Sequence, residues 1–270
     1  MLKLNAYQLK WIAIIGMFSW HLSFVLRDIL PLGALIPMTA VGGLTFPIMG
    51  FFVAEGYKHT SNLARYIIRL VIVGAISIPL YMVTVNVAIF NIMFSIALSL
   101  LVLKMYDAIK GKPIFWVLFI VVIAPMTLLI TFDWIFIAPL VVVLYHSIKS
   151  EKARRIVPGV VAGAIWTAMG AAALWALSMI NPLLETEHAA NVMPIRDGIY
   201  AMMGNTNAVI ASLTFGLGCL AAAFLVKNYN GERGKRMKWL FYTFYPIHLA
   251  IIAVIMLILG IADFGVFGFR

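Results

Sequence analysis

The chain has 270 residues, of which 64% are hydrophobic and only 11% charged, a composition far outside that of soluble globular domains. Its net charge of +10 does not indicate a nucleic-acid partner, because the basic residues form short clusters between apolar runs rather than one amphipathic face. The single cysteine, Cys219, excludes a disulfide framework within the chain. The composition therefore predicts an integral membrane protein with lipid as its surroundings.

Apolar runs recur along the whole sequence and predict an all-α, polytopic fold. The first run carries His21 and leads to Arg27-Asp28 without a small-residue cleavage site, so we expect a retained first helix rather than a cleaved signal. A hydrocarbon core of roughly 30 Å needs about 20 residues at about 1.5 Å per residue. On this basis we expect about nine transmembrane helices, at approximately 8–28, 43–60, 63–82, 89–110, 113–132, 134–149, 155–180, 206–227 and 237–260.

The distribution of Lys and Arg predicts how these helices are oriented. With nine helices, all but three of the 20 basic residues fall on one side, and the exceptions are Arg27, Arg196 and Arg270. Cytoplasmic loops retain Lys and Arg more than translocated loops do. We therefore expect a cytoplasmic N-terminus, an extracytoplasmic C-terminus and one sizeable external loop over 181–205.

Few charged or ionisable side chains lie inside the predicted helices. Each costs at least roughly 2.5–3.5 kcal/mol in the membrane and so needs a partner or a function. His21 lies in the first helix, with Arg27 near its outer end, and His248 lies near the middle of the last helix. Glu55 and His59 are four residues apart, so they share a helical face and can hydrogen-bond to each other.

A positive cluster follows this pair. Arg65 and Arg69 repeat the spacing of four at the start of the third helix, and Lys58 precedes them. Guanidinium groups bind phosphate through paired hydrogen bonds, so the cluster suits a phosphate-bearing ligand that enters from the cytoplasm. Alternatively, Lys58 and Arg65 are positive-inside anchors, the pair of Glu55 and His59 is structural, and the two buried histidines serve helix packing. The five histidines show no metal-binding spacing, so we expect no metal.

The order of these motifs resembles the TraX family. The stretch from Gly42 to Leu70 reads as a Phe-Pro pair, a Glu-Gly-aromatic triplet, a His-Thr pair, a tyrosine and an Arg-Leu pair. Three further stretches agree with the family in order: Lys10 to His21, Asn91 to Ser95, and Tyr242 to Leu249. The resemblance thus covers nearly the whole chain.

This resemblance implies an activity and a location. TraX-like proteins are membrane-embedded acetyltransferases of the bacterial inner membrane that use acetyl-CoA and modify pilin or other surface acceptors. It implies one acyltransferase domain over residues 1–270, whose acceptor is an extracytoplasmic protein amine or glycan hydroxyl. The residues that match the polar positions of the family are His21, Glu55, His59, Arg65 or Arg69, and His248.

Three positions depart from the family pattern. Trp20 stands where an aspartate usually precedes the histidine, and Gly43 stands where an arginine usually precedes the Phe-Pro pair. The glutamine or glutamate expected before the proline of the third helix is missing around Ser77-Ile78-Pro79. The departures remove an orienting carboxylate and a cation from the pattern.

The expected reaction is acyl transfer across the bilayer. Lys58, Arg65 and Arg69 would hold the phosphates of acetyl-CoA, and His21 would act as the general base. Arg27 or His248 would stabilise the oxyanion. Two alternatives stay open: chemistry on Glu55 and His59 with His21 binding the acceptor, and a ping-pong route through an acetylated histidine. The rival hypothesis from another class is a non-enzymatic permease or membrane scaffold.

Overall fold

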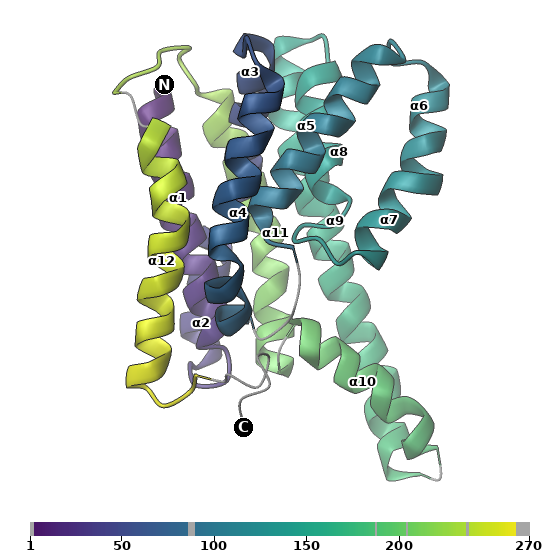
Figure 1. Ribbon diagram of the computed structural model, residues 1–270. Coiled ribbons are helices and arrows are strands. Elements are labelled where there is room, and N and C mark those ends of the chain that lie inside the picture. The colour runs from purple at the N-terminus through teal and green to yellow at the C-terminus, as the bar shows by residue number, and fades with distance from the viewer. Residues whose placement is uncertain (1–2, 86–89, 187, 204, 236–237, 263–270) are drawn as a thin grey trace.

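The chain folds into a bundle of helices (Figure 1). The computed structural model describes residues 3–85, 90–186, 188–203, 205–235 and 238–262. Within these ranges the backbone forms no β-strand longer than the isolated bridges Leu4–Tyr229 and Phe90–Phe132. The helices are α1 (Ala6–Val25), α2 (Leu32–Gly42), α3 (Thr45–His59), α4 (Leu63–Val85), α5 (Ile92–Ala108), α6 (Pro113–Leu118), η1 (Phe119–Ile123), α7 (Ala124–Leu129), α8 (Ile137–Ser147), α9 (Glu151–Ile180), η2 (Asn181–Glu185), α10 (Ala189–Met203), α11 (Thr206–Lys227) and α12 (Lys238–Ile258).

Polar side chains define where several helices begin. The Asn5 side chain accepts a hydrogen bond from the N–H of Gln8 at 3.0 Å, and the Gln8 side chain accepts one from the N–H of Asn5 at 3.0 Å. This reciprocal capping box satisfies main-chain donors that the first turn of α1 leaves free. Side-chain caps also begin α5, α9 and α11, and they come from Asn91, Ser150 and Asn205.

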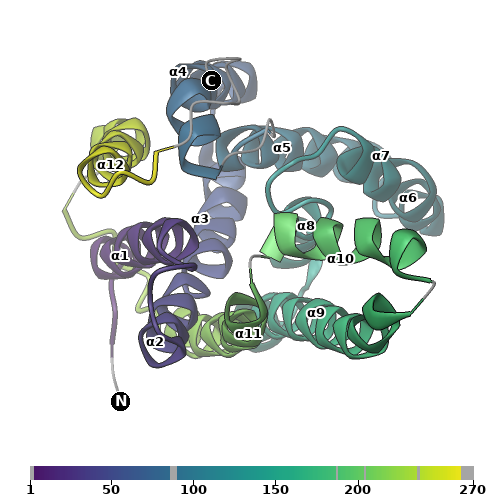
Figure 2. The same cartoon turned by 90° about the horizontal axis from the view of Figure 1, so that it is seen from below.

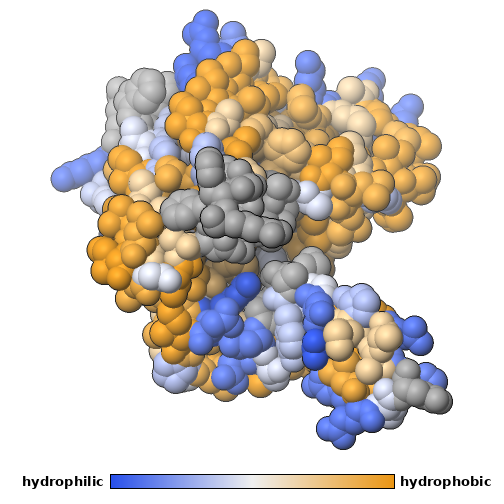
Figure 3. All heavy atoms as spheres, turned by 60° about the horizontal axis from the view of Figure 1, so that its bottom comes forward, coloured by the Kyte–Doolittle hydropathy of each residue, from blue (hydrophilic) through white to orange (hydrophobic). Residues whose placement is uncertain are grey.

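The architecture is that of a multi-pass membrane protein. Five helical segments in the described ranges are long and apolar enough to cross a membrane: Leu32–His59, Leu63–Val85, Glu151–Glu185, Thr206–Lys227 and Leu240–Ile258. Figure 3 shows apolar residues over much of the surface, with hydrophilic residues gathered around the end that carries α10. The count of nine spans and the orientation stay predictions, and the expected extracytoplasmic C-terminus falls on residues 263–270, outside the described ranges.

The second predicted helix is longer than expected. We expected this span at 43–60, but α2 and α3 together form one membrane-length segment, Leu32–His59. Pro37 lies inside α2. A proline is tolerated within a membrane helix when neighbouring groups satisfy the freed main-chain atoms. Nearby, the Thr39 hydroxyl lies 2.9 Å from the carbonyls of both Leu35 and Ala211, and so links α2 to α11.

The region predicted as spans 113–132 and 134–149 forms shorter helices. The apolar helices here are Pro113–Leu129 and Ile137–Ser147. At about 1.5 Å per residue, α8 is roughly 17 Å long and falls short of a 30 Å core. The segment between them turns inside the bundle, where the N–H of Asp133 donates to the carbonyl of Phe90 at 2.7 Å. An acidic side chain is thereby carried into the protein interior.

The helices form two rows with α3 and α8 between them (Figure 2). One row contains α2, α11 and α9, and the other contains α4, α5, α7 and α6. Small residues bring α9 and α11 close together: a Cβ at Gly216 would lie 2.0 Å from the Thr167 hydroxyl and 2.7 Å from the carbonyl of Gly163. Close approach through small residues is a main source of helix association in lipid.

The two ends of the bundle differ in charge. Figure 1 places the start of α1 and the end of α3 at one end, and α10 at the opposite end. Ion pairing ties the first end together, because Arg154 at the start of α9 binds Glu55 of α3 at 2.6 Å. We call this the basic end, since it carries the described residues Lys10, Lys58, Arg65, Arg69, Arg154, Arg155, Arg233 and Lys235.

Candidate functional site

A cavity of about 580 Å³ opens at the basic end. Its size lies within the usual range for small-molecule sites, which is roughly 300–1,000 Å³. The described residues that line it include no Asp or Glu, whereas Lys10, Arg65, Arg69, Arg233 and Lys235 all line it. We call it the basic cavity, and its charge favours a polyanionic ligand.

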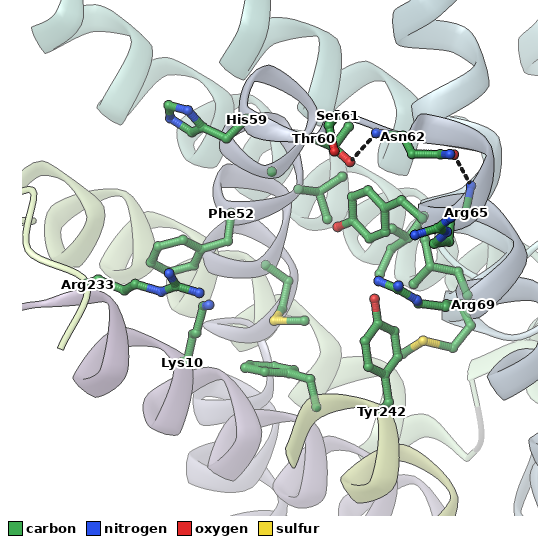
Figure 4. A pocket seen from close by; sticks show the side chains of 18 of the residues that line it. Lys10, Phe52, His59, Thr60, Ser61, Asn62, Arg65, Arg69, Arg233 and Tyr242 are labelled. Carbon is green, nitrogen blue, oxygen red and sulfur yellow. Dashed lines mark hydrogen bonds between the residues drawn. The ribbon is translucent and has the colours of Figure 1, made fainter. Parts of the chain in front are cut away.

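The basic side chains approach the cavity from several elements (Figure 4). Lys10 of α1 and Arg233 of the α11–α12 connection lie on one side, and Arg65 and Arg69 of α4 lie on the other. The Lys10 ammonium lies 5.0 Å from the centroid of the Phe52 ring, a cation–π distance. Tyr242 of α12 points toward Arg69. A ligand in the centre is therefore surrounded by cations that the sequence places far apart.

The structure divides the predicted donor-binding residues. Arg65, Arg69 and His59 line the basic cavity, whereas Lys58 and Glu55 do not. Phe52, Gly56 and His59 of α3 line the cavity, whereas Glu55 contacts Lys58 of the same helix and Arg154 of α9. Lys58 therefore does not line this cavity with the two arginines, and its ammonium lies 3.2 Å from the Glu55 carboxylate.

The predicted hydrogen bond between Glu55 and His59 is also not formed by these two described residues. The Glu55 carboxylate instead accepts from Arg154 at 2.6 Å and from Lys58 at 3.2 Å. Arg154 in turn donates to Glu151 at 2.6 Å. Two nearby cations attract a carboxylate more strongly than one imidazole does. The prediction failed because it did not include α9, whose position cannot be inferred from the helical periodicity of α3.

The two buried histidines meet in the middle of the bundle. His248 Nε2 of α12 lies 3.3 Å from His21 Nδ1 of α1, and their ring centroids are 5.0 Å apart. His21 is 5% exposed and His248 is fully buried. The sequence separates them by 227 positions, and the packing of α12 on α1 brings them together. His21 also lines a cavity of about 20 Å³, which we call the histidine chamber.

The hydrogen bonds assign the tautomers of this pair. His248 Nδ1 lies 3.0 Å from the carbonyl of Phe244, and His21 Nδ1 lies 2.9 Å from the carbonyl of Met17. A carbonyl only accepts, so both Nδ1 atoms carry the hydrogen. The Nδ1–H of His21 then donates to two acceptors, the carbonyl of Met17 and Nε2 of His248. The Nε2 atom of His21 keeps a free lone pair, as a base or nucleophile requires.

Sequence reasoning missed Asp133, which also lines the histidine chamber. Its carboxyl accepts a hydrogen bond from the Tyr81 hydroxyl, and the Tyr81 ring centroid lies 6.0 Å from that of His21. One signal was available: Asp133 is the only acidic residue between Asp107 and Glu151, inside a strongly apolar stretch. A carboxylate is thus present near His21 although the family's aspartate is replaced by Trp20.

The two cavities are neighbours. Met49 of α3 and Ile96 of α5 line both the basic cavity and the histidine chamber. Both residues are apolar. The basic cavity and the histidine chamber therefore adjoin between α3 and α5.

Arg27 lies away from His21. It lines a third cavity, of about 80 Å³, whereas His21 lines the histidine chamber, and Trp20 lines both. The Arg27 guanidinium lies over the Phe24 ring, 4.1 Å from its centroid. The expected contact of Arg27 with an oxyanion at His21 therefore has Trp20 in between.

The departures at Trp20 and Gly43 have a common structural reason. Trp20 packs against Phe215 of α11 with ring centroids 4.6 Å apart. A Cβ at Gly42 would lie 2.9 Å from the Cβ of Trp20, and a Cβ at Gly43 would lie 2.1 Å from the carbonyl of Phe215. An arginine has no room at Gly43, because α11 passes directly beside it.

The fold and site define a class: a multi-pass helical membrane protein with a polycationic cavity at one end and a buried histidine pair behind it. The chain belongs to the TraX family, because a family model described as TraX protein matches residues 5–256. The resemblance read from the motifs is thereby confirmed.

One curated relative adds a further likeness. The chain is 33% identical over 125 residues to the probable fimbrial assembly protein FimC, serogroup H1, of Dichelobacter nodosus. This match covers 41% of the chain and 50% of that relative, so the chain spans about half its length. No solved structure matches the chain.

Proposed function

We propose that this protein is an acetyltransferase of the bacterial inner membrane. It moves an acetyl group from cytoplasmic acetyl-CoA to an amine or hydroxyl of an extracytoplasmic acceptor. The observation that carries the proposal is the basic cavity with the histidine chamber directly behind it, because Met49 and Ile96 line both. Membership of the TraX family supports the same assignment.

The donor fits the basic cavity by charge and shape. CoA carries a diphosphate and a 3′-phosphate at one end and a long pantetheine arm that ends in the thioester. Arg65 and Arg69 on one side and Lys10 and Arg233 on the other would bind the phosphates. The arm would pass between Met49 and Ile96, and the thioester would reach the histidine chamber.

His21 would then act as the general base. The acceptor attacks the thioester carbonyl, its proton passes to Nε2 of His21, and the CoA thiolate leaves with the electrons of the broken C–S bond. The shared Nδ1 hydrogen ties His21 to His248 and fixes its ring. Asp133 lines the same chamber and would stabilise the positive charge that forms on His21.

The relative's name suggests the class of acceptor. It refers to fimbrial assembly in Dichelobacter nodosus. We therefore propose a fimbrial or pilin subunit as the acceptor, with a surface glycan as the other candidate.

Isothermal titration of acetyl-CoA into the detergent-solubilised protein tests the donor site. Losing one charge-assisted hydrogen bond costs about 1.5–3 kcal/mol, so Arg69→Gln is expected to weaken binding roughly tenfold to a hundredfold. Lys152→Gln is the matched control, because Lys152 is exposed at the start of α9 and does not line the cavity. His21→Gln is expected to keep binding and to lose acetyl transfer. Wild type that binds no acetyl-CoA would overturn the proposal in favour of a permease or scaffold.

A further inference from the structure

The third cavity lies between α1, α2, α9 and α11, on the opposite side of Trp20 from His21. We call it the outer cavity, because it is formed by the end of α1 and the start of α11, away from the basic end. Its volume is about 80 Å³, which leaves room for several water-sized atoms. The residues that line it are Trp20, Ser23, Phe24, Arg27, Leu35, Thr39, Trp166, Ala208, Ala211 and Ser212.

Two residues that line this cavity each carry a buried donor that lacks an acceptor among the described protein groups. They are Nη1 of Arg27 and the indole Nε1 of Trp166. A buried donor left without an acceptor costs about 1–3 kcal/mol, and more when it is charged. The hydroxyls of Ser23 and Ser212 line the cavity and donate to main-chain carbonyls, at 2.8 and 2.6 Å. Neither hydroxyl oxygen accepts from Nη1 of Arg27 or Nε1 of Trp166.

The nearest acid only partly neutralises Arg27. Nε of Arg27 lies 3.8 Å from the Asp28 carboxylate, whose side chain is 66% exposed. The other oxygen of that carboxylate accepts from the side chain of Asn205 at 2.9 Å. Asp28 does not line the outer cavity. The described lining therefore offers a guanidinium and an indole N–H and no carboxylate, so it favours an anion with at least two acceptor oxygens.

We propose that the outer cavity is the acceptor subsite, where Arg27 and Trp166 bind a carboxylate or phosphate group that the acceptor carries beside its nucleophile. This assignment deepens the proposed acetyl transfer and rests on it. Because Trp20 lines both the outer cavity and the histidine chamber, a group held at Arg27 brings its neighbouring amine or hydroxyl next to the chamber. An acceptor without an anionic group then lacks this anchor, which makes the subsite a source of selectivity.

NMR of protein labelled with ¹⁵N-tryptophan in phosphatidylcholine nanodiscs tests the subsite. The chain has seven tryptophans, and Trp166→Phe assigns the Trp166 indole signal by removing it. Inorganic phosphate or acetate, titrated at constant ionic strength, is expected to shift this signal in a saturable way. Arg27→Gln is expected to weaken the apparent affinity at least tenfold. Arg196→Gln, which alters a partly exposed arginine of α10 paired with Asp197, is the matched control and is expected to retain the shift.

A second arm identifies the source of the anion. In nanodiscs that contain phosphatidylglycerol, a shift without added anion that is lost in Arg27→Gln would assign the site to a lipid headgroup. A shift only with soluble phosphate or acetate would assign it to a free acceptor. If Arg27→Gln does not fold, Arg27→Lys replaces it, because lysine keeps the charge but loses the planar donor pair and so also weakens binding.

Three results would overturn the subsite: no shift with either anion, an equal shift with chloride, or an unchanged shift in the Arg27 variants. The titration contains no acetyl-CoA, so these results differ from a failure of the proposed function. That failure would appear as a wild type that binds anions at Trp166 but no acetyl-CoA.

Discussion

Glu55 has two possible roles that experiment can separate. The sequence favours a catalytic role, whereas in the structure Glu55 forms ion pairs with Arg154 and Lys58. Its carboxylate binds Arg154 at 2.6 Å and Lys58 at 3.2 Å, and the Glu55 and Arg154 side chains are 27% and 12% exposed. A hydrogen bond to a charged group contributes about 1.5–3 kcal/mol. Glutamine keeps the shape and one neutral acceptor, so we expect Glu55→Gln to cost about 1–2 kcal/mol. For a chain of this size, that lowers the melting temperature by roughly 2–8 °C.

Thermal unfolding in detergent, followed by tryptophan fluorescence, measures this loss. Arg154→Gln and the double variant complete a mutant cycle, in which the two losses should not add because they remove the same contact. Glu185→Gln is the control, since Glu185 is exposed at the end of η2. An unchanged melting temperature together with complete loss of acetyl transfer would refute the reasoning and return Glu55 to the catalytic residues.

Two further predictions address the chamber and the helix packing. Asp133→Asn removes the charge beside His21 while keeping the shape, so acetyl transfer should fall roughly tenfold to a hundredfold with acetyl-CoA binding retained; an unchanged transfer rate would contradict this role. Gly218→Ala places a Cβ 1.9 Å from the carbonyl of Ala40, and such overpacking costs about 1–3 kcal/mol, visible as a lower melting temperature. Gly33→Ala, with no atom within 4 Å of the added carbon, should be neutral.

The polar residues show which features of the site can be predicted from residue spacing and which cannot. Arg65 and Arg69 were expected on one face because they are four apart, and both line the basic cavity. The same spacing failed for Glu55 and His59, because Arg154 approaches from α9 and takes the carboxylate. Spacing fixes which side of a helix a residue occupies, but not which distant helix packs there.

The sequence alone determined the membrane-protein class, the helical fold, the family motifs and the rare polar residues inside apolar runs. These follow from composition and short-range periodicity, which a single helix expresses by itself. Only the tertiary structure decided that His21 and His248 meet, that Asp133 lines the same cavity as His21, and that Arg27 lines a different one. Apolar helix faces are chemically similar in a membrane protein, so they do not determine which helices pack together. Close-packed small residues and hydrogen bonds between buried polar groups determine it.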